Sequence, residues 1–184
     1  PNAAVIAIDD DVLYRRTTVR NLLRAREPSQ HSILGTNAKL VFRSRSQVAF
    51  AFRTRGCVSR QSSESTYFIK CNGILYPPRC FDQRAFNREA ILSIVPLRGA
   101  DIWFWAAAIA QGTHQRCIGR AVRFGIPKWR GAPSTEYPGA EVMEKRFAAT
   151  VDYFGIRQKL CAELPDRSEH GRIVSLPSRD ASGT

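Results

Sequence analysis

No hydrophobic run in this 184-residue sequence is long enough to cross a lipid bilayer. The longest, Ile102 to Ala110, falls far short of the roughly 20 residues that a spanning helix needs. The front of the chain also lacks the basic and apolar segments of a signal peptide. The first residue is Pro1 and the single methionine is Met143, so we expect the natural start to lie upstream.

The sequence also lacks closely spaced pairs of cysteines. The five cysteines are an odd number, widely spaced and without a CxxC pair: Cys57, Cys71, Cys80, Cys117 and Cys161. This spacing favours neither a zinc site nor a disulfide framework and predicts reduced thiols in a cytoplasmic protein. The sequence also has no glycine-rich phosphate loop of a standard spacing and no Ser-His-Asp order.

The composition is that of a folded α/β domain. Hydrophobic residues make up 43% of the chain and aromatic residues 10%. Strands are expected at 5–8, 39–42, 48–52, 66–70 and 114–118, and helices at 17–27, 82–94, 101–111 and 140–154. We therefore predict one α/β domain over residues 1–164, followed by a polar, disordered tail at 165–184.

Positive charge is concentrated in one stretch. Between Arg15 and Arg60 there are eleven basic residues and one acid, Glu27, which accounts for +10 of the net charge of +12. Such a stretch attracts nucleic acid, anionic lipid head groups or diphosphate-bearing substrates. The alternative interpretation is a solvated basic face with no specific partner.

Three consecutive acids, Asp9, Asp10 and Asp11, end the apolar run Val5–Ile8. Carboxylates at the end of a buried strand are costly unless a cation lies among them. Mg²⁺ or Mn²⁺ bound to a substrate diphosphate suits such oxygen ligands, and strand ends in α/β sheets are where nucleotides bind. An exposed acidic turn is the competing explanation.

Asp101 opens an expected helix and is followed by Ile102 and the aromatic residues Trp103, Phe104 and Trp105. An acid at a helix start interacts favourably with the helix dipole, which is a sufficient structural explanation. The functional interpretation makes Asp101 a general base for an acceptor hydroxyl. The aromatic residues either pack in the core or provide a platform on which a sugar ring stacks.

A third motif is Asn72-Gly73-Ile74-Leu75-Tyr76-Pro77-Pro78. Gly73 indicates either a bulge or close approach of the backbone to a ligand. The Pro-Pro pair predicts a rigid extended loop.

In this order, Ile8 to Tyr14, Asn72 to Pro78, Phe86 to Glu89 and Ala100 to Phe104 resemble a bacterial glycosyltransferase family of the GT-A fold. Members are associated with capsule and lipopolysaccharide synthesis. The resemblance covers about Ala4 to Leu160 and is strongest from Gly73 to Gly112. It implies a GT-A-like catalytic domain that lacks its N-terminal strands and helices in this chain.

The resemblance also implies a nucleotide-sugar donor, a DxD metal site and transfer to a saccharide or lipid-linked acceptor. Asp9 and Asp11 match the metal-binding acids, for Mn²⁺ or Mg²⁺, and Asp101 matches the catalytic acid. The donor or acceptor would contact Asp10, Asn72, Gly73 and Trp103. Two departures stand out: Ala100 replaces the first of two consecutive acids, and the last helix starts Met143-Glu144-Lys145-Arg146 instead of being Asn/Asp-rich.

Three functions follow from the sequence. The preferred one is a cytoplasmic, metal-assisted glycosyltransferase, peripheral to the inner membrane face where the basic stretch meets anionic lipid. The second is an inactive remnant of such an enzyme. The third, a basic nucleic-acid-binding module, explains the charge but not the acids or the aromatic helix start, and it lacks a recognisable binding motif.

Overall fold

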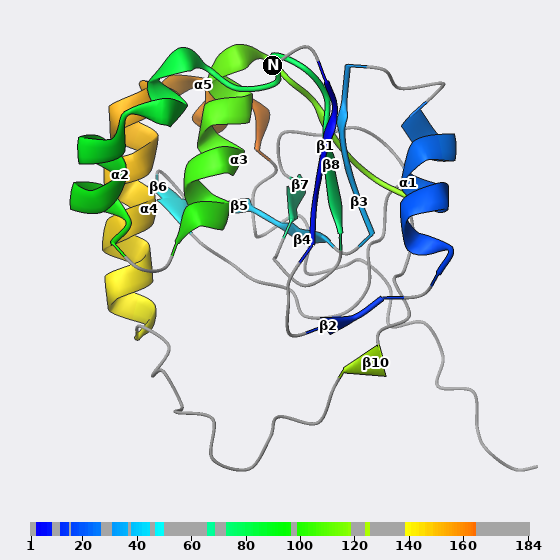
Figure 1. Ribbon diagram of the computed structural model, residues 1–184. Coiled ribbons are helices and arrows are strands. Elements are labelled where there is room, and N and C mark those ends of the chain that lie inside the picture. The colour runs from blue at the N-terminus through cyan, green and yellow to red at the C-terminus, as the bar shows by residue number, and fades with distance from the viewer. Residues whose placement is uncertain are drawn as a thin grey trace, which may run out of the picture.

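The computed structural model of the chain describes residues 3–8, 12–14, 16–26, 31–36, 38–44, 47–49, 66–68, 73–96, 99–118, 124–125 and 139–164. These residues form a mixed α/β fold in which helices lie on both sides of a small sheet (Figure 1). The α/β class predicted from the sequence is confirmed. The acidic run at 9–11, Asn72 and the polar tail lie outside the described residues.

The central sheet joins segments that are far apart in the sequence. Its four strands lie in the order β1 (Val5–Ala7), β8 (Ile74–Tyr76), β3 (Ile33–Gly35) and β9 (Gln115–Cys117). Strand β8 is antiparallel to both β1 and β3, whereas β3 and β9 are parallel, so the sheet is mixed. The register places Val5 opposite Tyr76 and Ala7 opposite Ile74.

Three smaller strand pairs are antiparallel. They are β2 (Val12–Leu13) with β10 (Phe124–Gly125), β4 (Ala38–Leu40) with β7 (Thr66–Phe68), and β5 (Phe42–Ser44) with β6 (Gln47–Ala49). Strands are thus present within or beside the predicted ranges 39–42, 48–52, 66–70 and 114–118, and the first of these ranges spans the end of β4 and the start of β5.

One helix, α1 (Thr18–Arg26), lies on one side of the sheet, and the others lie on the opposite side (Figure 1). The second group consists of η2 (Gln83–Phe86), α2 (Arg88–Ile94), α3 (Ala100–Gln111), α4 (Ala140–Phe154) and α5 (Arg157–Glu163). Under α1, Leu22, Leu34 and Leu75 form a small buried cluster. The larger core lies around α3, where α4, α5 and η2 pack against it.

The sequence explains why α3 is the central helix. Residues 102–109 are apolar on all sides of the helix, so the helix must be surrounded by protein, and all of them except Phe104 are buried. Helix α4 is apolar on one side only, where Met143, Phe147, Thr150, Val151 and Phe154 are buried. Both helices end at a glycine in the left-handed conformation, Gly112 and Gly155.

The expected helix at 82–94 is instead two elements. Asp82 begins the 3-10 turn η2 by accepting a hydrogen bond from the backbone N–H of Arg84 at 2.8 Å. Asn87 then has an extended backbone, with φ −74° and ψ 100°, and begins α2 by accepting from the N–H of Ala90. A side chain of asparagine that accepts a hydrogen bond from the backbone competes with continuation of the helix, so the helical segment is interrupted at Asn87.

Two further expectations are wrong. Val5 to Ala7 forms a strand, but it is the edge strand of the sheet, and Val5 and Ile8 are 51% and 59% exposed. The strand before the acids is therefore not buried on both faces. Cys117 is disulfide-bonded, so the expectation of reduced thiols fails at this position, whereas Cys80 and Cys161 are thiols.

Candidate functional site

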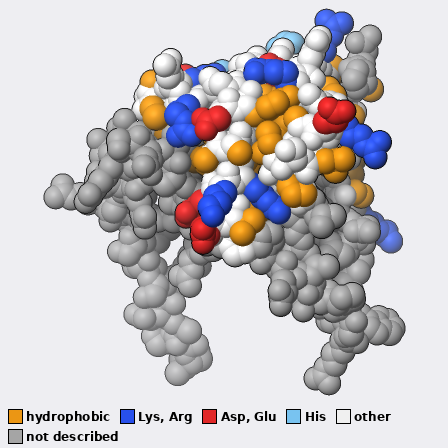
Figure 2. Space-filling view, turned by 90° about the vertical axis from the view of Figure 1, so that its left-hand side faces the viewer, with side chains coloured by type: hydrophobic (Ala, Val, Ile, Leu, Met, Phe, Trp, Pro, Cys, Tyr) orange, Lys and Arg blue, Asp and Glu red, His pale blue; other side chains and the backbone are white. Residues whose placement is uncertain are grey.

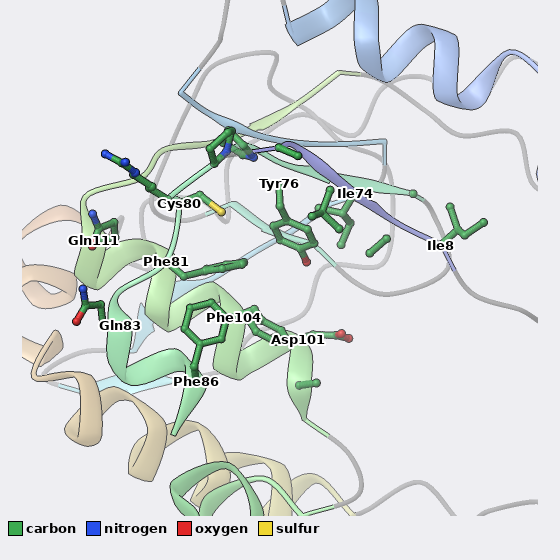
Figure 3. Close-up of a pocket in the computed structure, with 18 residues that line it drawn as sticks. Ile8, Ile74, Tyr76, Cys80, Phe81, Gln83, Phe86, Asp101, Phe104 and Gln111 are labelled. Carbon is green, nitrogen blue, oxygen red and sulfur yellow. The ribbon is translucent and has the colours of Figure 1, made fainter. Parts of the chain in front are cut away.

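A pocket of about 910 Å³ lies between the edge of the sheet and α3 (Figure 3). We call it the edge pocket. Strand β1 and the adjoining strand β8 contribute one wall, and the first turn of α3 with Phe104 contributes another. The loop between β8 and η2 closes it. The residues that line it are Ala3, Val5, Ala7, Ile8, Gly73, Ile74, Tyr76, Pro77, Pro78, Arg79, Cys80, Phe81, Gln83, Phe86, Ala100, Asp101, Phe104 and Gln111.

Three aromatic rings from three segments form one side of the edge pocket. The ring centroids of Tyr76 and Phe81 are 5.1 Å apart, those of Phe81 and Phe104 are 5.1 Å apart, and those of Tyr76 and Phe104 are 6.4 Å apart. Phe86, which is 67% exposed, also lines the pocket. Aromatic rings on a pocket wall offer flat apolar faces to a ligand, so this side suits a ring-shaped one.

Asp101 lies in the first turn of α3 and is half-buried at the edge pocket. The helix begins at Gly99, which has φ 113° and makes no side-chain cap. The hydroxyl of Tyr76 lies on the side of the pocket where Asp101 enters it (Figure 3). Burial raises the pKa of Tyr76 far above its ordinary value, and the charges of Asp101 and Cys80 raise it further. The phenol therefore stays protonated and can donate a hydrogen bond beside the carboxylate.

The loop between β8 and η2, which lines the pocket, is held in place by hydrogen bonds to α3 and α4. The backbone N–H of Asp82 donates to the carbonyl of Ala107 on α3 at 3.2 Å. Arg84 pairs with the Asp82 carboxylate through two hydrogen bonds of 2.9 and 3.0 Å, which holds the pKa of Asp82 below its usual range. Arg84 also donates to the carbonyls of Tyr153 and Phe154 at the end of α4. The loop is thus fixed to both core helices.

Arg79, in the same loop, is the one non-glycine residue with a positive φ, 58°, among those that the structure describes. This conformation is unfavourable for a side chain with a Cβ, and it persists where the surrounding structure imposes it. Here the preceding Pro77 and Pro78 and the fixed Asp82 restrict the loop. The result is an exposed arginine at the edge of the pocket.

Gly73 lines the pocket, but its conformation and its packing each explain the glycine. Its φ is +74°, and a Cβ there would lie 3.3 Å from Cγ2 of Thr18 and 3.4 Å from Cδ1 of Leu22. A side chain would strain the backbone and crowd α1. These contacts with α1 account for the glycine, and the close approach to a ligand stays a prediction.

Trp103 is not among the residues that line the edge pocket. It is fully buried, its indole Nε1 donates to the carbonyl of Ala85 at 2.9 Å, and its ring lies about 5 Å from those of Tyr153 and Phe154. Its neighbour Phe104 instead reaches the edge pocket. The position of Trp103 gives no support to the ligand contact predicted for it. Of the two neighbouring residues, Phe104 is the one that lines the pocket.

The predicted metal ligands Asp9 and Asp11, together with Asp10 and Asn72, lie outside the described residues. Within the described ranges, no group of three His, Cys, Asp or Glu side chains is placed to hold a metal ion. Ile8, the residue before Asp9, lines the edge pocket. The residue that directly precedes the acids in the sequence therefore lies on the pocket wall.

Sequence reasoning singled out Asp101, Gly73 and the Pro-Pro pair, and the structure brings all three to one pocket. It missed Phe81 and the two glutamines, Gln83 and Gln111, and it named Phe86 only as part of a segment that resembles the family. The Pro77-Pro78 turn was the available signal, because a rigid loop beside a strand end positions the residues that follow it.

No helix in the described part of the chain is long and apolar enough to cross a membrane. Comparison of the sequence and structure with known protein families, curated proteins and solved structures finds no match.

Proposed function

We propose that this chain is the catalytic part of a metal-dependent glycosyltransferase with a GT-A-like fold, which moves a sugar from a nucleotide-diphosphate donor to an acceptor hydroxyl. One observation carries the proposal: Asp101, the protonated Tyr76 and Ile8, which directly precedes the acidic run, all line one aromatic-walled pocket. Described residues from all four segments that resemble the family line this pocket, among them Ile8, Tyr76, Phe86 and Asp101.

The donor set suits the metal. Asp9 and Asp11 provide hard carboxylate oxygens of the kind that Mn²⁺ and Mg²⁺ prefer, and they directly follow a pocket-lining residue. When bound, the cation would stabilise the negative charge of the leaving diphosphate.

The chain's own residues supply the remaining functions. The rings of Tyr76, Phe81 and Phe104 offer a wall against which a sugar ring packs. Asp101 accepts the proton of the acceptor hydroxyl as that oxygen attacks the sugar, while the Tyr76 phenol donates a hydrogen bond to a sugar oxygen. The amides of Gln83 and Gln111 provide further polar contacts along the pocket.

The test is Asp101→Asn in the full-length protein, assayed with nucleotide-sugar donors and Mn²⁺. Asparagine keeps the size of the side chain and removes the base, so transfer should fall about 10²- to 10⁴-fold. Donor binding should persist in calorimetry, and because the dipole interaction is worth only about 0.3 to 1 kcal/mol, the melting temperature should change by a few degrees.

Glu144→Gln is the matched control, because it removes one exposed carboxylate from α4, away from the residues that line the pocket. Near-normal turnover of Asp101→Asn would refute the assigned role. Full-length protein that binds no donor with Mn²⁺ present would favour the inactive remnant instead.

A further inference from the structure

The outer face of α1 combines exposed apolar side chains with arginines. Val19 and Leu23 are 46% and 47% exposed, and they line a shallow hollow of about 420 Å³ together with Arg16, Arg20 and Arg24. We call these five residues the α1 surface. The three arginines recur at intervals of four residues and therefore follow one side of the helix.

The inner face of α1 is fixed by the core. Leu22 is fully buried against Leu34 and Leu75, and Gly73 lets the helix approach β8 closely. At about 100° per residue, Leu23 lies about 100° and Val19 about 60° around the helix from Leu22, so both lie on the flank of α1, where they are half-exposed. Rotating the helix to bury them would expose Leu22, so the fold itself keeps the two apolar side chains outside.

The charged side chains of residues 16–26 all have the same sign. From Arg16 to Arg26 the chain holds four arginines and no acid. Figure 2, which views the molecule from the side of α2 and α4, shows that acidic and basic side chains alternate around the hydrophobic ones there. On that side, for example, Lys145 pairs with Glu141 at 2.7 Å. Hydrophobic exposure combined with a single sign of charge thus distinguishes α1.

We propose that the α1 surface binds an anionic lipid membrane. Val19 and Leu23 would enter the boundary between head groups and acyl chains, and the arginines beside them would contact lipid phosphates while their stems extend along the apolar region. Nucleic acid would also attract the arginines, but phosphate contacts alone give no role to two exposed aliphatic side chains. This inference is independent of the proposed transferase activity.

The experiment measures co-sedimentation of the full chain with two kinds of vesicle: phosphatidylcholine alone, and equal parts of phosphatidylcholine and phosphatidylglycerol. The chain should bind the second kind, and salt should weaken binding. Arg20→Gln/Arg24→Gln should reduce partitioning roughly thirtyfold, because each cation near an anionic surface contributes about fivefold. Val19→Ser/Leu23→Ser should reduce it about tenfold through lost apolar burial.

Arg88→Gln/Lys145→Gln is the matched control, because it removes the same charge from exposed positions on α2 and α4. This variant should bind as the parent does. If it loses as much binding as the α1 arginine variant, the attraction is a property of net charge and the proposal fails. Normal vesicle binding by the Val19/Leu23 variant would contradict membrane insertion of the two side chains. Complete displacement of vesicles from the parent chain by duplex DNA would also contradict the proposal. Either result would favour nucleic acid as the partner of the α1 surface.

Discussion

Replacing Trp103 by phenylalanine separates the two roles that the sequence allows for this residue. The structure places Trp103 in the core, so we expect Trp103→Phe to destabilise the fold and to leave ligand binding in the edge pocket intact in the protein that remains folded. Its neighbour Phe104 is on the same helix but lines the pocket. The two positions thus provide a matched pair.

The magnitude follows from what the indole does. Trp103 is fully buried, and its Nε1 donates to the carbonyl of Ala85 at 2.9 Å. Phenylalanine removes that donor, and a buried acceptor that loses its partner costs about 1 to 3 kcal/mol. The smaller ring also leaves space against Tyr153 and Phe154, for about 1 to 2 kcal/mol more. The free energy of unfolding should therefore fall by about 2 to 5 kcal/mol.

Urea denaturation followed by circular dichroism measures this change, and the melting temperature should drop by about 5 to 15 °C. Phe104→Leu is the control, because Phe104 is half-buried and the swap keeps most of its volume, so it should cost less than about 1.5 kcal/mol. A Trp103→Phe protein as stable as the parent, with weakened glycan or nucleotide-sugar binding, would show that Trp103 is a ligand platform and that its assignment to the core is wrong.

Two further predictions concern buried positions near the sheet. A Cβ on Gly35 would overlap the ring of Phe68, so Gly35→Ala should lower the free energy of unfolding, measured by urea titration, by about 1 to 3 kcal/mol. Gly139 has open space around it, so Gly139→Ala is the control and should lower it by less than about 1 kcal/mol. Equal effects of the two substitutions would contradict the packing argument. Burial raises the pKa of the Cys80 thiol to about 11, so its alkylation by iodoacetamide, measured at the Cys80 peptide by mass spectrometry, should be slow at neutral pH and accelerate until the pH passes about 11. Acceleration that is complete by about pH 9 would refute the shift.

The elements that the sequence predicts well are those with local signals. The helix at 140–154 follows from one-sided apolar spacing with a glycine after it, and α3 follows from an apolar run that ends at Gln111-Gly112. The interruption at Asn87 could not be predicted in this way, because it depends on which backbone N–H donates to the Asn87 side chain. The short helix α5 was missed because a seven-residue segment carries little periodicity, and Leu160 is buried only by contacts with distant parts of the chain.

Of the polar residues that line the edge pocket, the sequence singled out Asp101 and missed Gln83 and Gln111, and it gave no indication of the pocket's shape. Asp101 carries a local signal, an acid at a helix start, but the edge pocket exists only because β1 pairs with β8 and α3 packs behind them. Sequence periodicity cannot give strand order, so the exposure of Val5 and Ile8 was unexpected. The distinction between Trp103 and Phe104 has the same origin, because adjacent residues on a fully apolar helix look alike until their neighbours are known.

The position of Ala100 gives the missing acid of the family motif a structural meaning. Ala100 and Asp101 both line the edge pocket, and Asp101 is the one acid among the described residues that do so. A second carboxylate at position 100 would therefore have faced the same space. Its absence leaves any proton acceptance within the described pocket to Asp101, with the protonated Tyr76 beside it as a donor. Under the proposed function, a single carboxylate beside a neutral phenol still supplies a base and a donor, so alanine at position 100 alters the electrostatics of the site without removing the proposed base.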